Sequence, residues 1–178
     1  IEIAPKGALF IDCSSIDVES ARLLHTKTKA AEHLCLDAPV SGGILGANAA
    51  KLTFMVGGEK AALEKALPLF EALGEKVIHT GIAGTGQAAK ICNNMILGIS
   101  MAAISEAYAL AEKLGLSQEK LFEVSSNASG QCWAMTEYSP VPGLVKNVPS
   151  NNDFKPGFTA QMMLKDLLLS QAASETAN

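Results

Sequence analysis

The feature that most constrains the fold is a change of pattern at residues 81–86. Before it, short apolar runs alternate with helical patterns, whereas residues 87–114 contain no proline, no glycine pair and no strand-like alternation. Alternating strands and helices indicate an open α/β sheet, and an unbroken apolar pattern of this length indicates one long helix. We therefore predict an α/β fold followed by an all-α region, with domains over residues 1–83 and 84–178.

Local signals refine this prediction. The expected strands are the apolar runs at residues 9–12, 34–37, 52–56 and 77–79. Ser14 and Asp17 have capping-box spacing at the start of a helix that runs to about Ala31. A second helix should be split by Pro68 and ended by Gly74. The helices expected in the second half are residues 87–114, 117–126 and 159–173, with a long ordered loop over 139–157.

Composition excludes several classes of protein. With 48% hydrophobic and 18% charged residues, the chain is not a disordered one. Its pI of about 5.4 argues against a nucleic-acid partner, because no basic stripe neutralises phosphates. The longest uncharged apolar run, residues 95–105, is short of the ~20 residues of a membrane span, so we expect no membrane partner.

The cysteines and histidines predict neither a metal site nor a disulfide framework. The three histidines form no cluster of ligands, and the cysteines have no C-x-x-C spacing: Cys13, Cys35, Cys92 and Cys132. A reducing compartment follows, and we expect the cytoplasm, or the mitochondrial matrix if the source is eukaryotic. Both ends of the chain look cut, since Ile1 lies close to a strand-like run and Asn178 follows an unterminated helical pattern. We therefore expect an internal portion of a larger protein.

A first candidate site is the segment from Asp37 to Gly43, directly after a predicted strand. In open α/β sheets, ligands bind outside the carboxyl ends of strands. Ser41 offers a hydroxyl group, and Gly42 and Gly43 allow backbone N–H groups to approach an anion closely. The alternative is a turn that simply requires small residues, and spacing alone favours that alternative.

The second candidate is the segment from Gly81 to Asn94, where glycines lead directly into the long helix. Lys90 and Asn94 are four residues apart and therefore share a helix face. A lysine in the first turns, among apolar neighbours, should have a lowered pKa, as a general base near neutral pH requires. A surface lysine that extends to water is an equally good interpretation. No G-x-G-x-x-G dinucleotide fingerprint occurs in the chain.

Two further features favour structural interpretations on pattern alone. Lys165 and Asp166 are adjacent charges in a leucine-rich helix, which is typical of a solvated stripe. Trp133 is the only tryptophan, and we expect it to anchor its loop in the core.

Taken together, these residues resemble the β-hydroxyacid dehydrogenases, and most closely the branch that oxidises 3-hydroxyisobutyrate. The segment 37–43 is similar to the family's substrate-binding signature. Residues 81–94 match its catalytic signature, G-x-x-G-x-G-x-x-x-K-x-x-x-N. The resemblance extends over essentially the whole chain. It implies a partial Rossmann-type sheet joined by the long helix to a helical domain that packs in a homodimer or homotetramer.

The resemblance also implies roles for site residues. Lys90 would be the catalytic lysine, which accepts the substrate hydroxyl proton, and Asn94 would position the substrate. Ser41, Gly42 and Gly43 would hold the substrate carboxylate. The implied reaction is oxidation of 3-hydroxyisobutyrate, or a similar small 3-hydroxy acid, to its semialdehyde, as in valine catabolism.

The implied cofactor is NAD, with NADP possible. Ser15 stands where relatives usually carry a threonine against the cofactor, and Lys165 matches a lysine that contacts the cofactor. The family's amino-terminal β-α-β unit, with its glycine-rich pyrophosphate turn, has no counterpart in the chain, and some carboxy-terminal helix is also missing. We expect the 178-residue chain alone to bind dinucleotide weakly and to turn over little or no substrate.

Three other functions stay open at this point. A 6-phosphogluconate dehydrogenase-like enzyme is less favoured, because Lys90 is the only basic residue of its motif. Those relatives also place a histidine before the asparagine of the catalytic helix, where this chain has Cys92, Asn93 and Asn94. Reduction of tartronate or succinic semialdehyde fits the same motifs. A non-catalytic oligomerisation module built on the long helix is the alternative from a different class, and substitution of Lys90 discriminates it from an enzyme.

Overall fold

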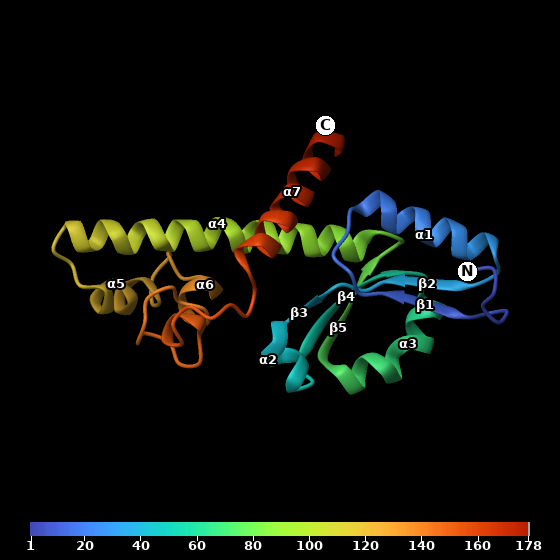
Figure 1. The fold of residues 1–178 in the computed structure, drawn as a ribbon, viewed down its shortest axis with the longest axis horizontal. Helices are drawn as coiled ribbons and strands as arrows, with labels where there is room; N and C mark the ends of the chain where they lie inside the picture. The colour runs from blue at the N-terminus through green and yellow to red at the C-terminus, as the bar shows by residue number, and fades with distance from the viewer. Residues whose placement is uncertain (178) are drawn as a thin grey trace. The chain divides into compact units, whose positions relative to one another are not determined.

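The computed structural model describes residues 1–177, whose elements are labelled in Figure 1. The strands are β1 Leu9–Asp12, β2 Leu34–Asp37, β3 Val40–Ser41, β4 Leu52–Gly58 and β5 Gly74–Gly81. The helices are α1 Val18–Ala30, α2 Gly43–Asn48, α3 Lys60–Leu73, α4 Thr85–Lys113, α5 Gln118–Ser125, α6 Trp133–Thr136 and α7 Ala160–Ala177, with a 3-10 turn, η1, at Pro149–Asn151. An α/β sheet followed by helices confirms the predicted fold class.

The chain forms two compact units. Residues 1–93 belong to one unit together with the end of the chain from Leu164, and residues 94–163 form the other. The start of α4 and most of α7 therefore share a unit, in which Ser170 Oγ donates to the Ile91 carbonyl at 3.3 Å. The division into domains at residue 83 stays a prediction.

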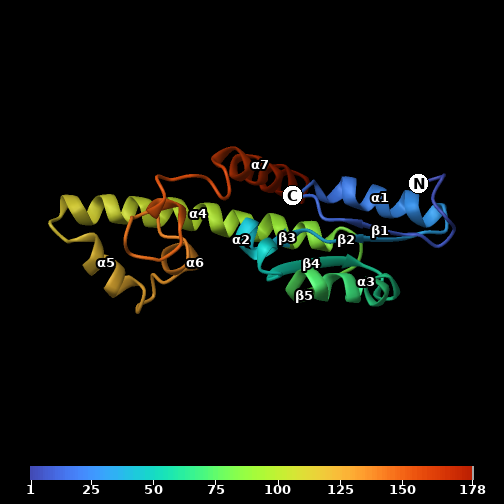
Figure 2. The same cartoon turned by 60° about the horizontal axis from the view of Figure 1, so that its bottom comes forward.

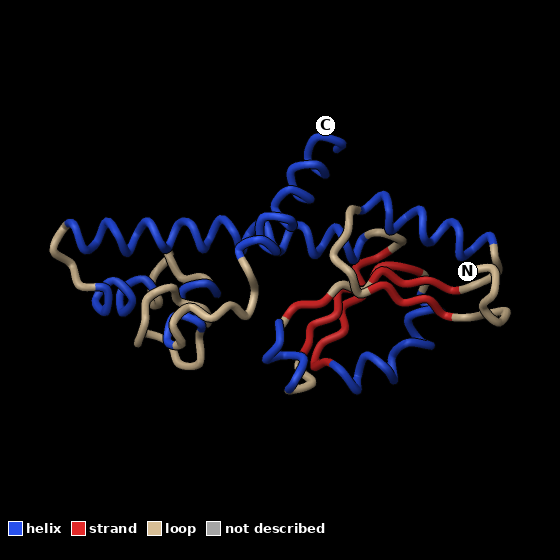
Figure 3. The backbone as a smooth tube through the Cα atoms, viewed as in Figure 1, coloured by secondary structure: helices blue, strands red, loops and turns tan. Residues whose placement is uncertain are grey.

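The sheet is mixed, with its strands drawn in red in Figure 3. β1 and β2 are parallel, β4 is antiparallel to both β2 and β3, and β5 is parallel to β4. β2 and β3 pair with β4 in one continuous register, interrupted only at Ala38 and Pro39. The Met55 amide donates to the Pro39 carbonyl at 3.0 Å across this interruption. Residues 37–41 thus follow the edge of β4 as one extended path, and α2 begins at Gly43.

α3 covers one face of the sheet, and α1 lies on the opposite face (Figures 1 and 2). The buried core on the α3 face consists of Leu36, Ala38, Phe54, Val56, Ala62, Ala66 and Phe70. The rings of Phe54 and Phe70 have centroids 4.5 Å apart. Burying a side chain of this size contributes about 1.5–3 kcal/mol. The residues between these positions, including Asp37, face α1 and are available for polar contacts.

Two predicted helix boundaries differ from the structure. The side chain that caps α1 is Asp17, which accepts from the Ser20 amide at 2.7 Å, so Ser14 lies before the helix. Pro68 does not split α3, which is continuous through it. Both Pro68 and Glu64, whose carbonyl loses its partner, are exposed, and water can satisfy that carbonyl. Gly74 follows the end of α3 as predicted.

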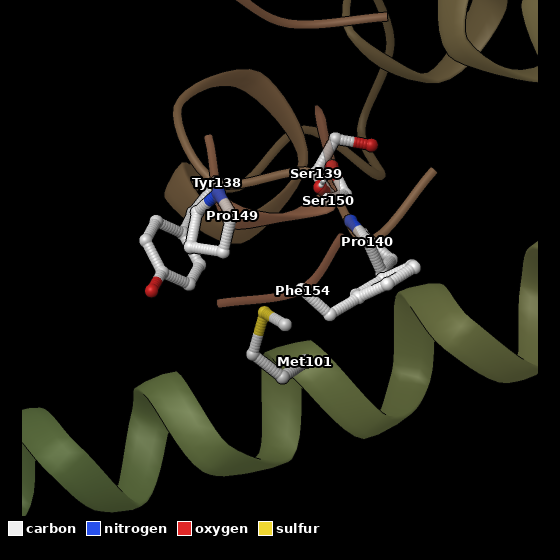
Figure 4. Close-up of a pocket in the computed structure, with 7 residues that line it drawn as sticks. All are labelled: Met101, Tyr138, Ser139, Pro140, Pro149, Ser150 and Phe154. Carbon is white, nitrogen blue, oxygen red and sulfur yellow. Dashed lines mark hydrogen bonds between the residues drawn. The ribbon is translucent and has the colours of Figure 1, made fainter. Parts of the chain in front are cut away.

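In the unit of residues 94–163, a small core packs against α4, formed by Ile104, Tyr108, Ala134 and Met135. Trp133 is not the predicted core anchor, because it is 53% exposed and stacks on Tyr138 with centroids 5.4 Å apart. Figure 4 shows a cavity of about 100 Å³ lined by Met101, Tyr138, Ser139, Pro140, Pro149, Ser150 and Phe154. Its lining is mainly apolar.

α4 leaves large apolar side chains uncovered. Ile96 and Ile99 are each more than 60% exposed, and Met95 is also exposed. By length and composition alone this helix could cross a membrane, a test that core helices of other proteins also pass. The expected packing of the helical domain in a homodimer or homotetramer stays a prediction.

Candidate active site

Lys90 lies in the second turn of α4 and is half-buried. Burial lowers the pKa of its ammonium group, because a desolvated charge is disfavoured. The negative charge of Asp166 opposes this shift, and the positive charge of Lys165 adds to it. The lysine is therefore not a freely hydrated surface group, and its surroundings favour a neutral amine more than water does.

The charges near Lys90 come from α7, 75 residues further along the chain. Asp166 is 4% exposed, and its Oδ1 lies 2.7 Å from Lys165 Nζ. Lys165 also donates to the Ser15 carbonyl at 2.9 Å. The solvated-stripe interpretation of this pair is thus wrong for Asp166, which is buried in the unit that contains Lys90.

The start of α4 is fixed by a carboxylate from the sheet. Asp37, at the end of β2, accepts from the Gly84 amide at 2.8 Å and from the Gln87 amide at 3.0 Å. These amides belong to the first turn, where helix N–H groups lack partners within the helix. A negative charge there also interacts favourably with the helix dipole. Asp37 therefore links the end of β2 to the helix that carries Lys90, three residues after Gln87.

Two glycines make room for this carboxylate. A Cβ atom at Gly57 would lie 2.6 Å from Asp37 Oδ1, and one at Gly86 would lie 2.5 Å from the Met55 carbonyl oxygen. Real Cβ atoms essentially never approach so closely. The glycine just before Gln87 is therefore required by the contact between α4 and the sheet.

His25 of α1 completes the environment of Asp37. Its Nε2 atom lies 2.9 Å from Asp37 Oδ1, and the Asp37 side chain is 2% exposed. Burial by itself would lower the pKa of His25, but hydrogen bonds and charge from Asp37 and Cys35 raise it to about 9. Burial likewise raises the pKa of Asp37, and the hydrogen bonds from His25, Gly84 and Gln87 lower it overall. The pair is therefore an imidazolium and a carboxylate at neutral pH.

This pair predicts a stability that falls at alkaline pH. The pKa of His25 is raised from 6.5 to about 9 on folding, so its contribution is complete below 6.5 and is lost as pH rises through 9. Asp37 contributes above its ordinary pKa of 3.8 and loses that contribution in acid. Urea denaturation of the full-length protein across this range should show the free energy of unfolding declining between pH 6.5 and 9. His25→Gln should flatten that decline.

A matched control is His79, whose Nε2 contacts the Gly58 carbonyl at 2.8 Å rather than a carboxylate. His79→Gln should leave the alkaline decline in place. An unchanged slope in His25→Gln would show that the decline arises from another group.

The predicted carboxylate-binding residues lie along the edge of β4. Ser41 ends β3 and is half-buried, and Gly42 and Gly43 lead into α2. Gly42 has a φ of +130°, and a Cβ there would lie 3.2 Å from Leu52 Cδ2, so only glycine fits without strain. This segment begins four residues after Asp37, which joins it to the first turn of α4.

The other predicted residues have defined positions. Asn94 lies one turn after Lys90 on α4 and is 2% exposed. Ser15 is half-buried in the segment between β1 and α1, where its carbonyl accepts from Lys165. Lys90, Lys165 and Ser15 belong to one compact unit, whereas Asn94 begins the other. Among residues 1–177, no group of three or more His, Cys, Asp or Glu side chains could hold a metal ion.

Sequence reasoning missed four residues of this site, namely His25, Asp37, Gln87 and Asp166. Asp37 stands at the end of a strand and inside a motif, a signal that was sufficient to single it out. Asp166 follows Lys165 directly, but its burial depends on packing. Nothing in the pattern of α1 marks His25, since histidine on a helix is ordinarily a surface residue.

Comparison with protein-family models matches both parts of the chain. Residues 84–178 match the NAD-binding domain of NADP-dependent 3-hydroxyisobutyrate dehydrogenase. Residues 1–81 match the NAD-binding domain of 6-phosphogluconate dehydrogenase. Both models describe NAD-binding domains, in agreement with the predicted NAD or NADP cofactor.

Individual relatives are also named as dehydrogenases. A protein named probable 3-hydroxyisobutyrate dehydrogenase from Mycobacterium tuberculosis is 53% identical over 170 residues, which are 96% of this chain and 58% of the relative. An NAD-dependent L-serine dehydrogenase from Pseudomonas aeruginosa is 47% identical over 175 residues, 98% of this chain and 58% of the relative. The solved structure of Mycobacterium tuberculosis 3-hydroxyisobutyrate dehydrogenase with L-serine has a TM-score of 0.94 at 52% identity, over 98% of this chain and 60% of that one.

The chain thus spans less than two thirds of the length of these relatives. The family models nevertheless match residues 1–81 and 84–178, which are almost all of the chain. The chain belongs to the β-hydroxyacid dehydrogenase family.

Proposed function

We propose that this chain forms part of an NAD(P)-dependent dehydrogenase that oxidises 3-hydroxyisobutyrate to its semialdehyde, with Lys90 as general acid and base. The observation that carries the proposal is the half-buried Lys90, whose pKa is lowered by burial. A base with a lowered pKa is effective near neutral pH, whereas an ordinary hydrated lysine is almost fully protonated there.

The proton chemistry follows from that pKa. In the oxidation, the neutral amine of Lys90 accepts the hydroxyl proton as the adjacent C–H bond gives up its hydride. The nicotinamide supplies the hydride acceptor when the cofactor is bound. In the reverse direction, the ammonium form of Lys90 returns the proton to the carbonyl oxygen. Asp166 stabilises the charged form, and it therefore sets how readily the lysine changes state.

We propose that Ser41 and the backbone amides of Gly42 and Gly43 bind the substrate carboxylate, and that Asn94 positions the substrate. A site that binds the carboxylate of a substrate at one end and its hydroxyl group at the other selects a short 3-hydroxy acid. 3-Hydroxyisobutyrate and L-serine share this skeleton and differ only in a methyl or an ammonium group at C2. The serine dehydrogenase among the relatives makes L-serine the second candidate substrate.

The residues after β1 fit a dinucleotide. This segment follows the carboxyl end of a strand in an α/β sheet, where ligands bind, and it contains the small side chains of Cys13, Ser14 and Ser15. Lys165 is half-exposed at this point and anchored on the Ser15 carbonyl. We propose that Ser15 and Lys165 hold the NAD cofactor, with NADP as the alternative.

We further propose that a second copy of the protein covers the exposed apolar residues of α4, to give a homodimer or homotetramer through the helical part. The uncovered Ile96 and Ile99 support this assembly. We place the enzyme in valine catabolism, in the cytoplasm or, if the source is eukaryotic, in the mitochondrial matrix. The reduced state of all four cysteines is consistent with either compartment.

A substrate panel tests the proposed function. The full-length protein is assayed with NAD⁺ and NADP⁺ by the absorbance of the reduced nicotinamide, against 3-hydroxyisobutyrate, L-serine and 6-phosphogluconate. Reduction of tartronate and succinic semialdehydes is assayed in parallel. The expected result is the highest kcat/KM with 3-hydroxyisobutyrate. A preference for 6-phosphogluconate, or the absence of any hydroxy-acid oxidation, would reject the proposal.

A further inference from the structure

Gln87 is a fully buried polar side chain in the first turn of α4, with an exposed fraction of 0%. A buried carboxamide must find partners for both its oxygen and its nitrogen, because a buried polar group without a partner destabilises the fold. Glutamine is rare at buried positions for this reason. Its partners therefore indicate what this residue holds in place.

Both partners lie in the main chain between β1 and α1. Gln87 Nε2 donates to the Ser14 carbonyl at 2.7 Å, and Gln87 Oε1 accepts from the Ile16 amide at 3.2 Å. A carbonyl can only accept and an amide N–H can only donate, so this pair of contacts fixes the orientation of the carboxamide. Gln87 thus binds the main chain on both sides of Ser15.

The residues 14–16, here called the Ser15 segment, have few other anchors. The Ser14 amide donates to Asp12 Oδ1 at 2.9 Å, and Lys165 donates to the Ser15 carbonyl at 2.9 Å. The segment is neither helix nor strand, and its polar groups are satisfied by side chains instead of a ladder. α1 begins at Val18, after its N-cap Asp17.

We propose that Gln87 is a positioning residue that fixes the Ser15 segment in the conformation that binds the dinucleotide. This inference rests on the proposed function, in which Ser15 contacts the cofactor. The same residue donates its own amide to Asp37 and precedes Lys90 by three residues. Gln87 therefore joins the cofactor-binding segment to the helix of the catalytic lysine through one buried side chain.

The decisive substitution is Gln87→Met, which keeps the length of the side chain and removes both hydrogen bonds. In the full-length protein, the Kd for NADH, measured by fluorescence titration, should rise about tenfold, as expected when two hydrogen bonds that order a binding segment are lost. The KM for the hydroxy acid should change less than about twofold, because Ser41 to Gly43 do not touch Gln87. Hydrogen exchange of the Ile16 amide should accelerate by at least about tenfold.

Gln87→Glu separates positioning from a general loss of packing. Ionised glutamate presents two acceptors and cannot donate to the Ser14 carbonyl, whereas protonated glutamic acid can. The Kd for NADH of this variant should therefore approach that of the wild type as pH falls. The charged groups anchored near this position are Asp12, Asp37 and Lys165, and all three are unchanged in the variant.

Gln171→Met is the matched control, since Gln171 is exposed on α7 and its side chain donates to Glu175 of its own helix. It should alter neither the Kd for NADH nor the exchange of Ile16. The inference is overturned if Gln87→Met preserves both quantities, or if it weakens NADH and hydroxy-acid binding equally. A wild-type protein that binds NADH and oxidises no hydroxy acid would reject the proposed function, while the Kd and exchange would still decide the role of Gln87.

Discussion

Lys90→Ala is expected to lower kcat for hydroxy-acid oxidation by about 10²–10⁴-fold, the usual contribution of a general acid or base. The amine is half-buried and its pKa is lowered, so no water molecule can replace it at equal strength and position. The measurement is steady-state kinetics of the full-length protein with saturating dinucleotide. Gel filtration should give the same size as the wild type, because the assembly proposed for α4 does not depend on this amine.

Lys113→Ala is the matched control, since Lys113 is exposed in the last turn of the same helix. It should leave kcat unchanged. If Lys90→Ala keeps activity and alters the assembly instead, the chain is an oligomerisation module and the catalytic assignment fails.

The pH profile of kcat/KM provides a second test of Lys90 as the group that accepts the proton. Asp166 raises the pKa of Lys90, so Asp166→Asn should lower that pKa further and move the acid limb of kcat/KM to lower pH. An acid limb that stays in place would mean that another group accepts the proton.

Asp37→Ala should lower the free energy of unfolding by about 3–5 kcal/mol at neutral pH, as the loss of one member of a buried ion pair usually does. The carboxylate accepts from His25, Gly84 and Gln87, and its removal leaves a half-buried imidazolium and two helix amides without their acceptor. Urea denaturation of the full-length protein, followed by circular dichroism, measures the difference.

The exposed pair between Lys29 and Glu59 provides the control, with Nζ and Oε1 2.8 Å apart. Glu59→Gln should leave the unfolding curve almost unchanged, because solvent screens an exposed pair. Combining Asp37→Ala with His25→Ala should lower the free energy of unfolding by less than the sum of the two single changes. The double variant has neither an imidazolium without its carboxylate nor a carboxylate without its imidazolium. Strict additivity would contradict direct coupling of these two side chains.

The fold could be predicted from local patterns because the signals there are strong and short in range. Apolar runs at residues 9–12 and 34–37 form β1 and β2, and Gly74 marks the end of α3. The start of α1 could not be predicted in the same way. Ser14 has good capping spacing, but Asp17 caps the helix. The Ile16 amide and the Ser14 carbonyl instead bond to Gln87, which is 71 and 73 residues away.

The residues of the candidate site also differ in whether a local pattern could predict them. The resemblance to the family singled out Lys90, Ser41 to Gly43 and Lys165 as candidates, because its signatures place residues at fixed spacing within one segment. The contacts that fix those segments join distant parts of the chain, as Asp37 does with Gly84 and Lys165 does with Ser15. A sequence pattern contains no measure of such contacts. His25 and Asp166 became visible only through burial and charge in the folded chain.

The compact unit that contains Lys90 is discontinuous, since α7 returns to it after residues 94–163. On the ribosome, the amine at position 90 is therefore synthesised long before the carboxylate at 166 that stabilises its charge. The sheet can form early, but the electrostatic surroundings of the lysine are complete only after the intervening helices have emerged. A nascent chain arrested ahead of α7 would contain Lys90 without the counter-charge of Asp166.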